Sequence, residues 1–347
     1  DRAFGVFLFN ASGVSLGVTN ALVTIIDNES AAGQLDNTFS ANIGSGANGL
    51  IYSLGLSANG LIVAGGDFNR FNALARTNVV RLGADGVPDV SFIPPPITFR
   101  GASASVRAVA VYQSGNNVGK VLIGGQFDHI AGVSRTNIAR LNTDGSLDLT
   151  FDPGLGADNI VLSIALQNNG LALIGGIFTK VNGNSLNFLA RLNADGSVDG
   201  TFTPGGGPNA PVRSVAVDGN NIVIGGDFTL VDTVSRNYIA RLNPDGTVDK
   251  TFDPGTGANS SVHTVTVDAN SNVILGGIFT NIGGANFLRI ARLNPDGSVD
   301  GSFLPAPGAD QFVNALALQT DGKIVLGGGF LNIDGRGQNN ISRITSN

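Results

Sequence analysis

A cassette that occurs six times along the chain constrains its fold more than any other feature. Each copy ends a short apolar run with two glycines, one variable residue and a phenylalanine. The copies read VAGGDF at Val63, LIGGQF at Leu122, LIGGIF at Leu173, VIGGDF at Val223, ILGGIF at Ile274 and VLGGGF at Val325. A second element begins at Leu147, Val198, Val248 and Val299, so its period is 51, 50 and 51 residues. A constant period in this range is typical of a solenoid, a propeller or an array.

Each period predicts four short strands. In the fourth copy the expected strands are 213–217, 222–225, 238–242 and 248–252, and the links between them are rich in Gly, Asn, Asp and Pro, which favour turns. Four strands joined by links of hairpin length are typical of a propeller blade. We therefore predict an all-β fold, a six-bladed β-propeller that occupies residues 31–347.

The two ends of the repeat region complement each other. The first copy begins at its fourth strand, LDNTF at Leu35, whereas the last copy ends after its third strand, ISRI at Ile341. Pairing of the strand 35–39 with the strand 341–344 would leave no incomplete blade and would cover an open sheet edge. We expect the N-terminal strand to close the propeller in this way.

The repeated residues also carry a family resemblance. The copies follow the pattern I-V-I-G-G-x-F and then A-R-L-N-x-D-G-[ST]-[VL]-D-x-[TS]-F, which resembles the delta-60 repeat over about residues 35–347. That bacterial family is described as a β-propeller and is found in large proteins, often secreted or exposed at the cell surface. The resemblance implies an extracellular or cell-surface location and no established enzymatic activity.

Residues 1–30 lie outside the repeat and read as a β-hairpin. Its alternating strands are expected at 4–9 and 21–26, and an acidic run from Asp27 to Glu29 follows them. This segment resembles the last two strands of a Calx-β domain, which ends in a similar strand followed by acidic residues. The resemblance makes Asp27 and Glu29 candidate calcium ligands, whose partner ligands would come from strands that this sequence lacks.

An isolated hairpin is marginally stable in water, so this one needs a partner sheet. The first residue is Asp1 and not a methionine, and we expect a processed or excised piece that has lost the preceding Calx-β strands. Alternatively, the hairpin completes a sheet on a neighbouring chain or on the propeller of its own chain. Pairing with a neighbouring chain would join chains head to tail. The candidate assembly residues are Phe4, Val6, Leu8, Leu22, Thr24 and Ile26.

The composition excludes several partners and chemistries. A net charge of −6 argues against binding to a nucleic-acid backbone, which needs clustered Lys and Arg. The chain contains no Cys, which excludes thiol catalysis, disulfides and Cys-type zinc sites. No apolar run approaches the roughly 20 residues of a membrane-spanning helix. We expect no nucleic-acid partner, no membrane span and no cofactor other than calcium.

Most residues that recur in every copy are predicted to build the blade. An arginine on the third strand recurs with an aspartate on the fourth, as in Arg241 and Asp249, and adjacent strands would bring the two within reach of an ion pair. The paired glycines would allow a bulge or a close backbone approach, and the phenylalanine would fill the space between blades. Four N-x-D-G stretches are interpreted as hairpin turns and not as calcium loops, because arginine takes the place of a further acidic ligand. They begin at Asn142, Asn193, Asn243 and Asn294.

Binding is expected where the copies differ at equivalent positions. One such set lies on the first strands, which line the central channel of a propeller: Tyr52, Arg107, Leu162, Arg213, His263 and Asn314. The second set lies between the glycine pair and the phenylalanine: Asp67, Gln126, Ile177, Asp227, Ile278 and Gly329. We expect the two sets to converge near one mouth of the channel. Their polar and aromatic members are the candidate ligand-binding residues.

No pattern in the sequence indicates catalysis. The two histidines, His129 and His263, lie in different blades, and no carboxylate faces His263 within its own blade, so neither a triad nor a zinc site is expected. Arg213 and Asp227 are interpreted first as a local ion pair and second as a ligand clamp. The second copy carries insertions at 93–105 and 113–120, which we expect to lengthen surface loops.

Three hypotheses about function follow. The first is a non-enzymatic extracellular module, a structural or binding part of a bacterial surface, matrix or fibre protein, whose partners are other protein chains or copies of itself. The second is a glycan-binding or glycan-cleaving propeller that works through the channel mouth. The third is an intracellular adaptor that binds protein partners.

Overall fold

The computed structural model describes residues 39, 42–100, 102–303 and 308–345, and its regular secondary structure consists almost entirely of β-strands. The predicted all-β class is therefore confirmed. The chain divides into two compact units. Unit 1 runs up to Ala172 and includes Lys180–Asn184 and Leu192–Val198, whereas unit 2 comprises Leu173–Thr179, Ser185–Arg191 and the chain from Asp199 onward.

Unit 1 contains two three-stranded antiparallel sheets. In strand order they are β1 (Leu50–Leu56), β2 (Ile62–Asp67) and β5 (Val79–Leu82), and β8 (Ser105–Val111), β9 (Val121–Gln126) and β12 (Ile138–Leu141). A small hairpin of β3 (Arg70–Phe71) and β4 (Leu74–Ala75) accompanies the first sheet, and one of β10 (His129–Ile130) and β11 (Val133–Ser134) accompanies the second. The turn from β8 to β9 contains a short 3-10 helix, Gly115–Asn117.

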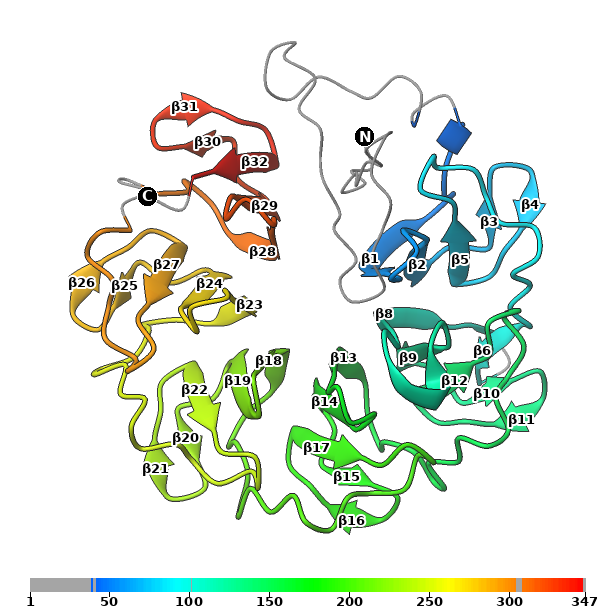
Figure 1. Cartoon of the computed structure of the whole chain (residues 1–347), viewed down its shortest axis with the longest axis horizontal. Helices are drawn as coiled ribbons and strands as arrows, with labels where there is room; N and C mark the ends of the chain where they lie inside the picture. Colours follow the sequence, from blue (N-terminus) through cyan, green and yellow to red (C-terminus); the bar gives the residue numbers. More distant parts are fainter. Residues whose placement is uncertain (1–38, 40–41, 101, 304–307, 346–347) are drawn as a thin grey trace. The chain divides into compact units, whose positions relative to one another are not determined.

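Unit 2 repeats this arrangement three times (Figure 1). Its sheets, in strand order, are β18 (Val212–Asp218), β19 (Asn221–Gly226) and β22 (Ile239–Leu242); β23 (Val262–Val267), β24 (Val273–Gly277) and β27 (Ile290–Leu293); and β28 (Val313–Leu318), β29 (Ile324–Gly328) and β32 (Ile341–Ile344). The small hairpins are β20 (Leu230–Val231) with β21 (Val234–Ser235), β25 (Asn281–Ile282) with β26 (Ala285–Asn286), and β30 (Asn332–Ile333) with β31 (Arg336–Gly337).

The boundary between the two units passes through the third copy of the cassette. That copy holds β13 (Val161–Leu166), β14 (Ala172–Gly176), β15 (Lys180–Val181), β16 (Asn184–Ser185) and β17 (Leu189–Leu192). The six copies of the cassette thus each supply one blade of a propeller, as the period predicts.

The predicted fourth strand at 248–252 is wrong. Val248 makes a single bridge with Leu242, and Thr251 then donates from both its backbone N and its Oγ1 to Asp249 Oδ1, at 2.9 and 2.6 Å. An aspartate side chain that captures the backbone two residues ahead favours a turn over a strand. The chain instead forms the hairpin β20–β21 inside the stretch predicted as a loop, where Asp232 at φ 52° supplies the left-handed turn that such hairpins need.

The glycine pair allows two close backbone approaches, as predicted. A Cβ atom on Gly225 would lie 2.6 Å from Val262 Cγ1 of the next sheet, and one on Gly226 would collide with the carbonyl oxygen of Pro211. The phenylalanine that follows, Phe228, is fully buried. The repeated G-G-x-F sequence therefore lets neighbouring sheets pack closely and fills the space between them.

The predicted arginine–aspartate pair forms in five copies. The Nε to Oδ2 distances are 2.7 or 2.8 Å for Arg81–Asp89, Arg140–Asp148, Arg191–Asp199, Arg241–Asp249 and Arg292–Asp300. Each guanidinium also lies over a phenylalanine ring, 4.5 to 4.9 Å from its centre. Several of these arginines reach the next copy as well: Arg81 Nη1 donates to the carbonyl of Thr143, and Arg140 Nη1 to that of Ala194, both at 2.6 Å.

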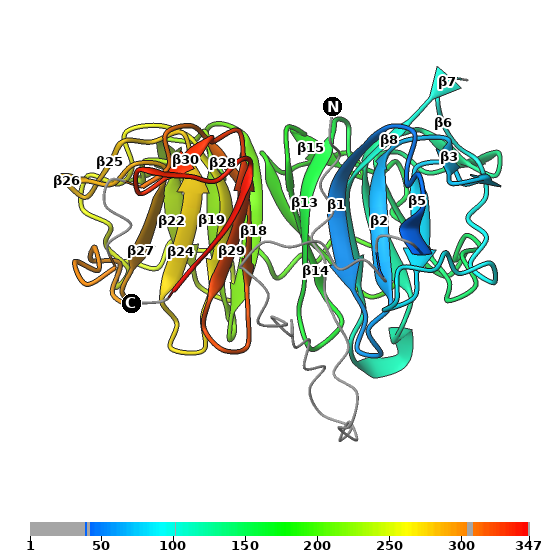
Figure 2. The same cartoon turned by 90° about the horizontal axis from the view of Figure 1, so that it is seen from above.

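The insertion at 93–105 does more than lengthen a loop. It contributes β6 (Ile97–Phe99) and β7 (Ala102–Ser103), which extend the hairpin β10–β11 into a four-stranded sheet in the order β11-β10-β6-β7. Figure 2 shows this pair projecting from the edge of unit 1. The insertion at 113–120 remains a surface turn that contains the 3-10 helix.

Two predictions concern residues outside the described part of the chain. The hairpin at 1–30, including Phe4, Val6, Leu8, Leu22, Thr24, Ile26, Asp27 and Glu29, lies there, as do residues 35–38 of the closing strand. Closure and the domain boundary near residue 30 therefore stay predictions. No helix in the described ranges is long and apolar enough to cross a membrane.

Candidate functional site

A β-bulge recurs in the first strand of the blades, at the position where the copies differ. The strand register shifts on either side of Tyr52, Arg107, Arg213, His263 and Asn314. A bulge leaves its extra residue outside the regular ladder and redirects the side chain. Each of these blades thus presents one non-repeated side chain from a strand at the edge of its sheet.

In unit 2 the bulge residue Arg213 meets the second predicted set. Its Nε donates to Asp227 Oδ1 at 2.7 Å, and Ser261 Oγ donates to the same oxygen at 2.5 Å. The Arg213 side chain is 41% exposed and that of Asp227 is 23% exposed, so the pair is open to a partner. Burial opposes ionisation of Asp227, but the hydrogen bonds from Arg213 and Ser261 outweigh it and lower its pKa. The predicted ion pair is confirmed, and Ser261 is an addition to it.

His263 is oriented by an amide of the next blade. Its Nδ1 lies 2.7 Å from Asn314 Oδ1, which joins two of the predicted residues. Burial lowers the pKa of His263 below 6.5, Arg213 lowers it further, and the Asn314 hydrogen bond and Asp227 oppose these effects. A lowered pKa favours the neutral ring near pH 7, and a neutral ring that donates from Nδ1 to the Asn314 oxygen has its acceptor at Nε2.

Together these five residues form a polar cluster in unit 2, on the edge strands β18, β23 and β28 and on the residues next to β19 and β23. The residues are Arg213, Asp227, Ser261, His263 and Asn314. The backbone N of Ile278 donates to the carbonyl of Ser261, and the side chain of Ile278 is 42% exposed, so an apolar surface adjoins the polar one. The cluster offers a cation, an anion and a neutral imidazole beside an apolar contact.

In unit 1 the bulge residues Tyr52 and Arg107 stack on each other. The Arg107 guanidinium lies 3.8 Å from the centre of the Tyr52 ring, and Arg107 Nε donates to Ser105 Oγ at 3.1 Å. Asp67 is exposed and pairs in register with Leu50, while Gln126 is half-buried and pairs with Ser105. The convergence of the two sets is thus seen within unit 2, where Arg213 bonds Asp227.

The other predicted features behave as structure. His129 contacts Asp128 of its own hairpin, with 2.9 Å between Nδ1 and Oδ1. The N-x-D-G stretches are tight turns, as predicted. In one of them Gly145 N donates to the Asn142 carbonyl, and Ser146 holds Asp144 Oδ1 through both its N and its Oγ.

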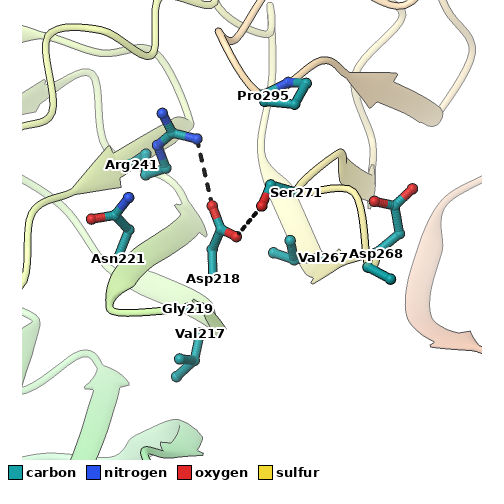
Figure 3. Close-up of a pocket in the computed structure, with 10 residues that line it drawn as sticks. Val217, Asp218, Gly219, Asn221, Arg241, Val267, Asp268, Ser271 and Pro295 are labelled. Atoms are coloured by element: carbon teal, nitrogen blue, oxygen red, sulfur yellow. Dashed lines mark hydrogen bonds and ion pairs between the residues drawn. The ribbon is translucent and has the colours of Figure 1, made fainter.

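Sequence reasoning missed a hollow at the other end of β18. Its volume is about 540 Å³, and Figure 3 shows Asp218 at its centre, between Arg241 and Ser271. Ser271 Oγ donates to Asp218 Oδ1 at 2.7 Å, and Arg241 Nη1 lies 3.5 Å from Oδ2. A signal was present in the sequence, because the turn DGNN at Asp218 is one residue shorter than SANGL at Ser57 or DANSN at Asp268.

A family model described as "Domain of unknown function (DUF5122) beta-propeller" matches the chain six times. The matched residues are 57–92, 119–151, 167–202, 220–252, 269–303 and 319–347. These segments cover more than half of the chain and follow the six copies of the cassette. No curated protein matches the chain.

Solved structures resemble the chain at low sequence identity. The computationally designed Ika8 protein is 14% identical with a TM-score of 0.51, and the match covers 85% of this chain and 90% of that one. YCF48 bound to D1 peptide is 13% identical with a TM-score of 0.45, covering 81% and 77%. XC5397 from Xanthomonas campestris, a gluconolactonase, is 14% identical with a TM-score of 0.46, covering 83% and 85%. At such identities the likeness to Ika8 concerns the fold alone.

Proposed function

The chain belongs to the family described as domain of unknown function (DUF5122) beta-propeller, and on that premise we propose that it is a non-enzymatic structural and binding module of an extracellular or cell-surface protein. The blades serve as scaffold, and the polar cluster of unit 2 recognises a partner. One observation carries the proposal: Arg213, Asp227 and Ser261 form a partly exposed hydrogen-bonded network at positions that differ among the copies.

The repeated side chains support the scaffold half of the proposal. Arg241 is engaged with Asp249 and Phe252, and Phe228 is buried between sheets. The side chains of such residues make contacts within the blade and are not available to bind a partner. The cluster residues are not required to build the blade, because other copies have tyrosine, leucine or asparagine at the position of Arg213.

The chemistry of the cluster suits a neutral, hydroxyl-rich partner. The Arg213 guanidinium can donate through nitrogens beyond Nε, Asp227 can accept, and His263 can accept at Nε2. The exposed side chain of Ile278 can contact an apolar face beside these groups. A sugar ring presents both kinds of surface, so a glycan is the favoured small partner, with a polar protein surface as the other.

The same geometry favours binding over catalysis. Asp227 is held as a carboxylate by Arg213 and Ser261, and Asn314 orients His263. A general base is usually oriented by a group that stabilises its charged form, and an amide oxygen does this less well than a carboxylate. We therefore propose that the module is not an enzyme.

The proposed location rests on composition and on resemblance. A chain with no Cys and no Met contains no easily oxidised sulfur, which suits an exposed environment. The resemblance to delta-60 repeats and to a Calx-β end points to a bacterial surface, matrix or fibre protein. Assembly through the hairpin at 1–30, by Phe4, Val6, Leu8, Leu22, Thr24 and Ile26, is part of this proposal.

A glycan array tests the binding half. We expect the chain to bind a small set of neutral glycans, and the triple variant Arg213→Ala, Asp227→Ala, His263→Ala to lose that binding. Lys250→Ala, a change of a non-repeated charged residue away from the cluster, serves as the matched control and should bind normally. Glycan binding that survives the triple change would overturn the assignment of the cluster.

Sedimentation tests the assembly half. The full chain should form concentration-dependent oligomers, whereas a chain that begins at residue 31 should sediment as a monomer. A monomeric full chain at high concentration would contradict assembly through the hairpin.

A further inference from the structure

The hollow beside Asp218 has a structural origin in the fourth copy of the cassette. Asp218 pairs directly with Asn221, which leaves a turn of two residues. In four other copies the equivalent turn contains one residue more, closed by hydrogen bonds from Ser57 N to the Leu61 carbonyl, Gln167 N to Leu171, Asp268 N to Asn272 and Gln319 N to Lys323. The missing residue leaves space between this turn and the longer turn of the fifth copy, and the hollow occupies it.

The hollow contains a carboxylate whose charge is only partly neutralised. The Asp218 side chain is 9% exposed, and its cationic neighbour Arg241 lies 3.5 Å away. Arg241 is already committed to Asp249, with 2.8 Å between Nε and Oδ2. One guanidinium therefore faces two carboxylates, and Ser271 Oγ adds only a neutral donor to Asp218 Oδ1 at 2.7 Å, so a further cation would offset the excess negative charge.

Arg241 also departs from the pattern of the other copies. In the first three copies with this pair, the Nη1 atoms of Arg81, Arg140 and Arg191 donate to the carbonyl of the next N-x-D-G turn. Arg241 Nη1 points to Asp218 instead, and Pro295 of the next turn lines the hollow (Figure 3). Arg241 thus lacks the hydrogen bond to the next turn that Arg81, Arg140 and Arg191 make.

The second copy shows what fits in this place. Lys120 is the equivalent of Asn221, because Tyr112 N donates to the Lys120 carbonyl where Asp218 pairs with Asn221. The Lys120 ammonium lies 2.8 Å from Asp148 Oδ2, the same oxygen that accepts from Arg140 at 2.7 Å. An ammonium beside the guanidinium is therefore compatible with the blade.

The charges of the two copies differ accordingly. In the second copy, Lys120, Arg140, Asp148 and Tyr112 sum to one positive charge, and in the fourth copy Asn221, Arg241, Asp249 and Asp218 sum to one negative charge. Relative to the second copy, the fourth copy thus has a neutral amide in place of the lysine ammonium and a carboxylate in place of the tyrosine.

We propose that this hollow binds a primary ammonium group from outside the chain, beside the guanidinium of Arg241, much as the Lys120 ammonium lies beside that of Arg140 in the second copy. Asp218 accepts from the ammonium, and Asn221 and Ser271 border it. The ammonium belongs to a lysine side chain of a partner protein or to a free small amine. The site lies roughly 17 Å from Arg213, at the other end of the seven-residue strand β18, so it is separate from the polar cluster.

NMR titration of the full chain tests the proposal. The probes are n-butylammonium and Nα-acetyl-lysine methylamide, and the neutral control is Nα-acetyl-norleucine methylamide. Both ammonium probes should shift the backbone amide signals of Gly219, Asn221 and Ser271 in a saturable way. The norleucine derivative should leave them in place. Equal shifts with the neutral control would overturn the proposal.

Two variants locate the site. Asp218→Asn should weaken binding at least about tenfold, since a hydrogen bond to a charged group is lost. Asn221→Lys should abolish binding while the fold persists, because it supplies the internal ammonium of the second copy. Asp321→Asn, which removes an exposed carboxylate paired with Lys323 in the sixth copy, should bind like the parent chain. Binding that survives both Asp218→Asn and Asn221→Lys would overturn the proposal.

The two probes also separate the two sources of the ammonium. A lysine derivative that binds about tenfold tighter than n-butylammonium supports a partner protein, because the flanking amides then add contacts. Equal affinity supports a free small amine. Neither result bears on the proposed function of the polar cluster, because glycan binding by the cluster is tested separately on the glycan array.

Discussion

The Nε of Arg140 and the Oδ2 of Asp148 lie 2.7 Å apart, and only 2% and 3% of these two side chains are exposed to solvent. Lys120 and Thr150 complete the shell of the carboxylate. A buried ion pair of this kind is worth little compared with apolar residues, but the loss of one partner leaves a buried charge alone.

Asp148→Ala should therefore lower the free energy of unfolding by about 3 to 5 kcal/mol. The same change at Asp300 should cost less, because the Arg292–Asp300 pair is more exposed, at 12% and 14%. Urea denaturation of both variants checks the difference. Equal losses in the free energy of unfolding for the two variants would show that the burial of the ion pair does not determine the size of the loss.

Acid should destabilise the protein from about pH 4 downward. Burial alone would raise the pKa of Asp148, but hydrogen bonds from Lys120, Thr150 and Arg140 outweigh it and hold the pKa well below 3.8. A carboxyl group whose pKa is lower in the folded state stabilises the fold above the unfolded value and loses that contribution as the pH falls toward the folded value. Asp89, Asp199, Asp249 and Asp300 shift in the same direction. Lys120→Ala should make the free energy of unfolding fall less steeply with decreasing pH, as measured by unfolding between about pH 2 and pH 5.

Gly225→Ala should destabilise the protein by about 1 to 3 kcal/mol through overpacking. The new methyl would lie 2.6 Å from Val262 Cγ1 and 2.9 Å from Val265 Cγ1, on two residues of a neighbouring strand. Gly200→Ala is the matched control, since no atom lies within 4 Å of the position that its new methyl would take, and the change should be neutral or stabilising by up to about 1 kcal/mol. Thermal unfolding of both variants separates the two outcomes.

His263 should titrate below pH 6.5. Burial is the main cause of its lowered pKa, and the charge of Arg213 adds to it, so Arg213→Ala should raise the midpoint. Asn314→Ala should lower the midpoint, because its hydrogen bond opposes the shift. The imidazole signals followed by NMR give both midpoints. If Arg213→Ala left the titration midpoint of His263 unchanged, Arg213 and His263 would not interact in solution.

Much of the fold could be predicted because the same residues recur at the same period. The pairing of Arg241 with Asp249, the packing of Phe228 and the close approach at Gly225 all follow from repetition joined to strand geometry. The fourth strand could not be predicted, because V-D-x-T-F alternates like a strand. Its aspartate captures the backbone of Thr251 instead, and that competition depends on local geometry.

The candidate site was predictable in part for the same reason. Comparing the copies singled out Arg213 and Asp227, and the structure joins them. Ser261 was missed because it precedes its strand and resembles an ordinary turn residue. The hollow at Asp218 was missed because a turn that is one residue shorter is visible in the sequence but does not by itself predict a hollow or a ligand.

The hydrogen bonds from Arg81, Arg140 and Arg191 to the next turn end on backbone carbonyls, and every residue type supplies one. This explains why Thr143, Ala194 and Pro244 can differ at the receiving position without loss of the joint. Gain or loss of a whole copy would therefore require no matching substitution at a receiving turn of this kind. Recognition differs in this respect, because it depends on single residues that belong to individual copies.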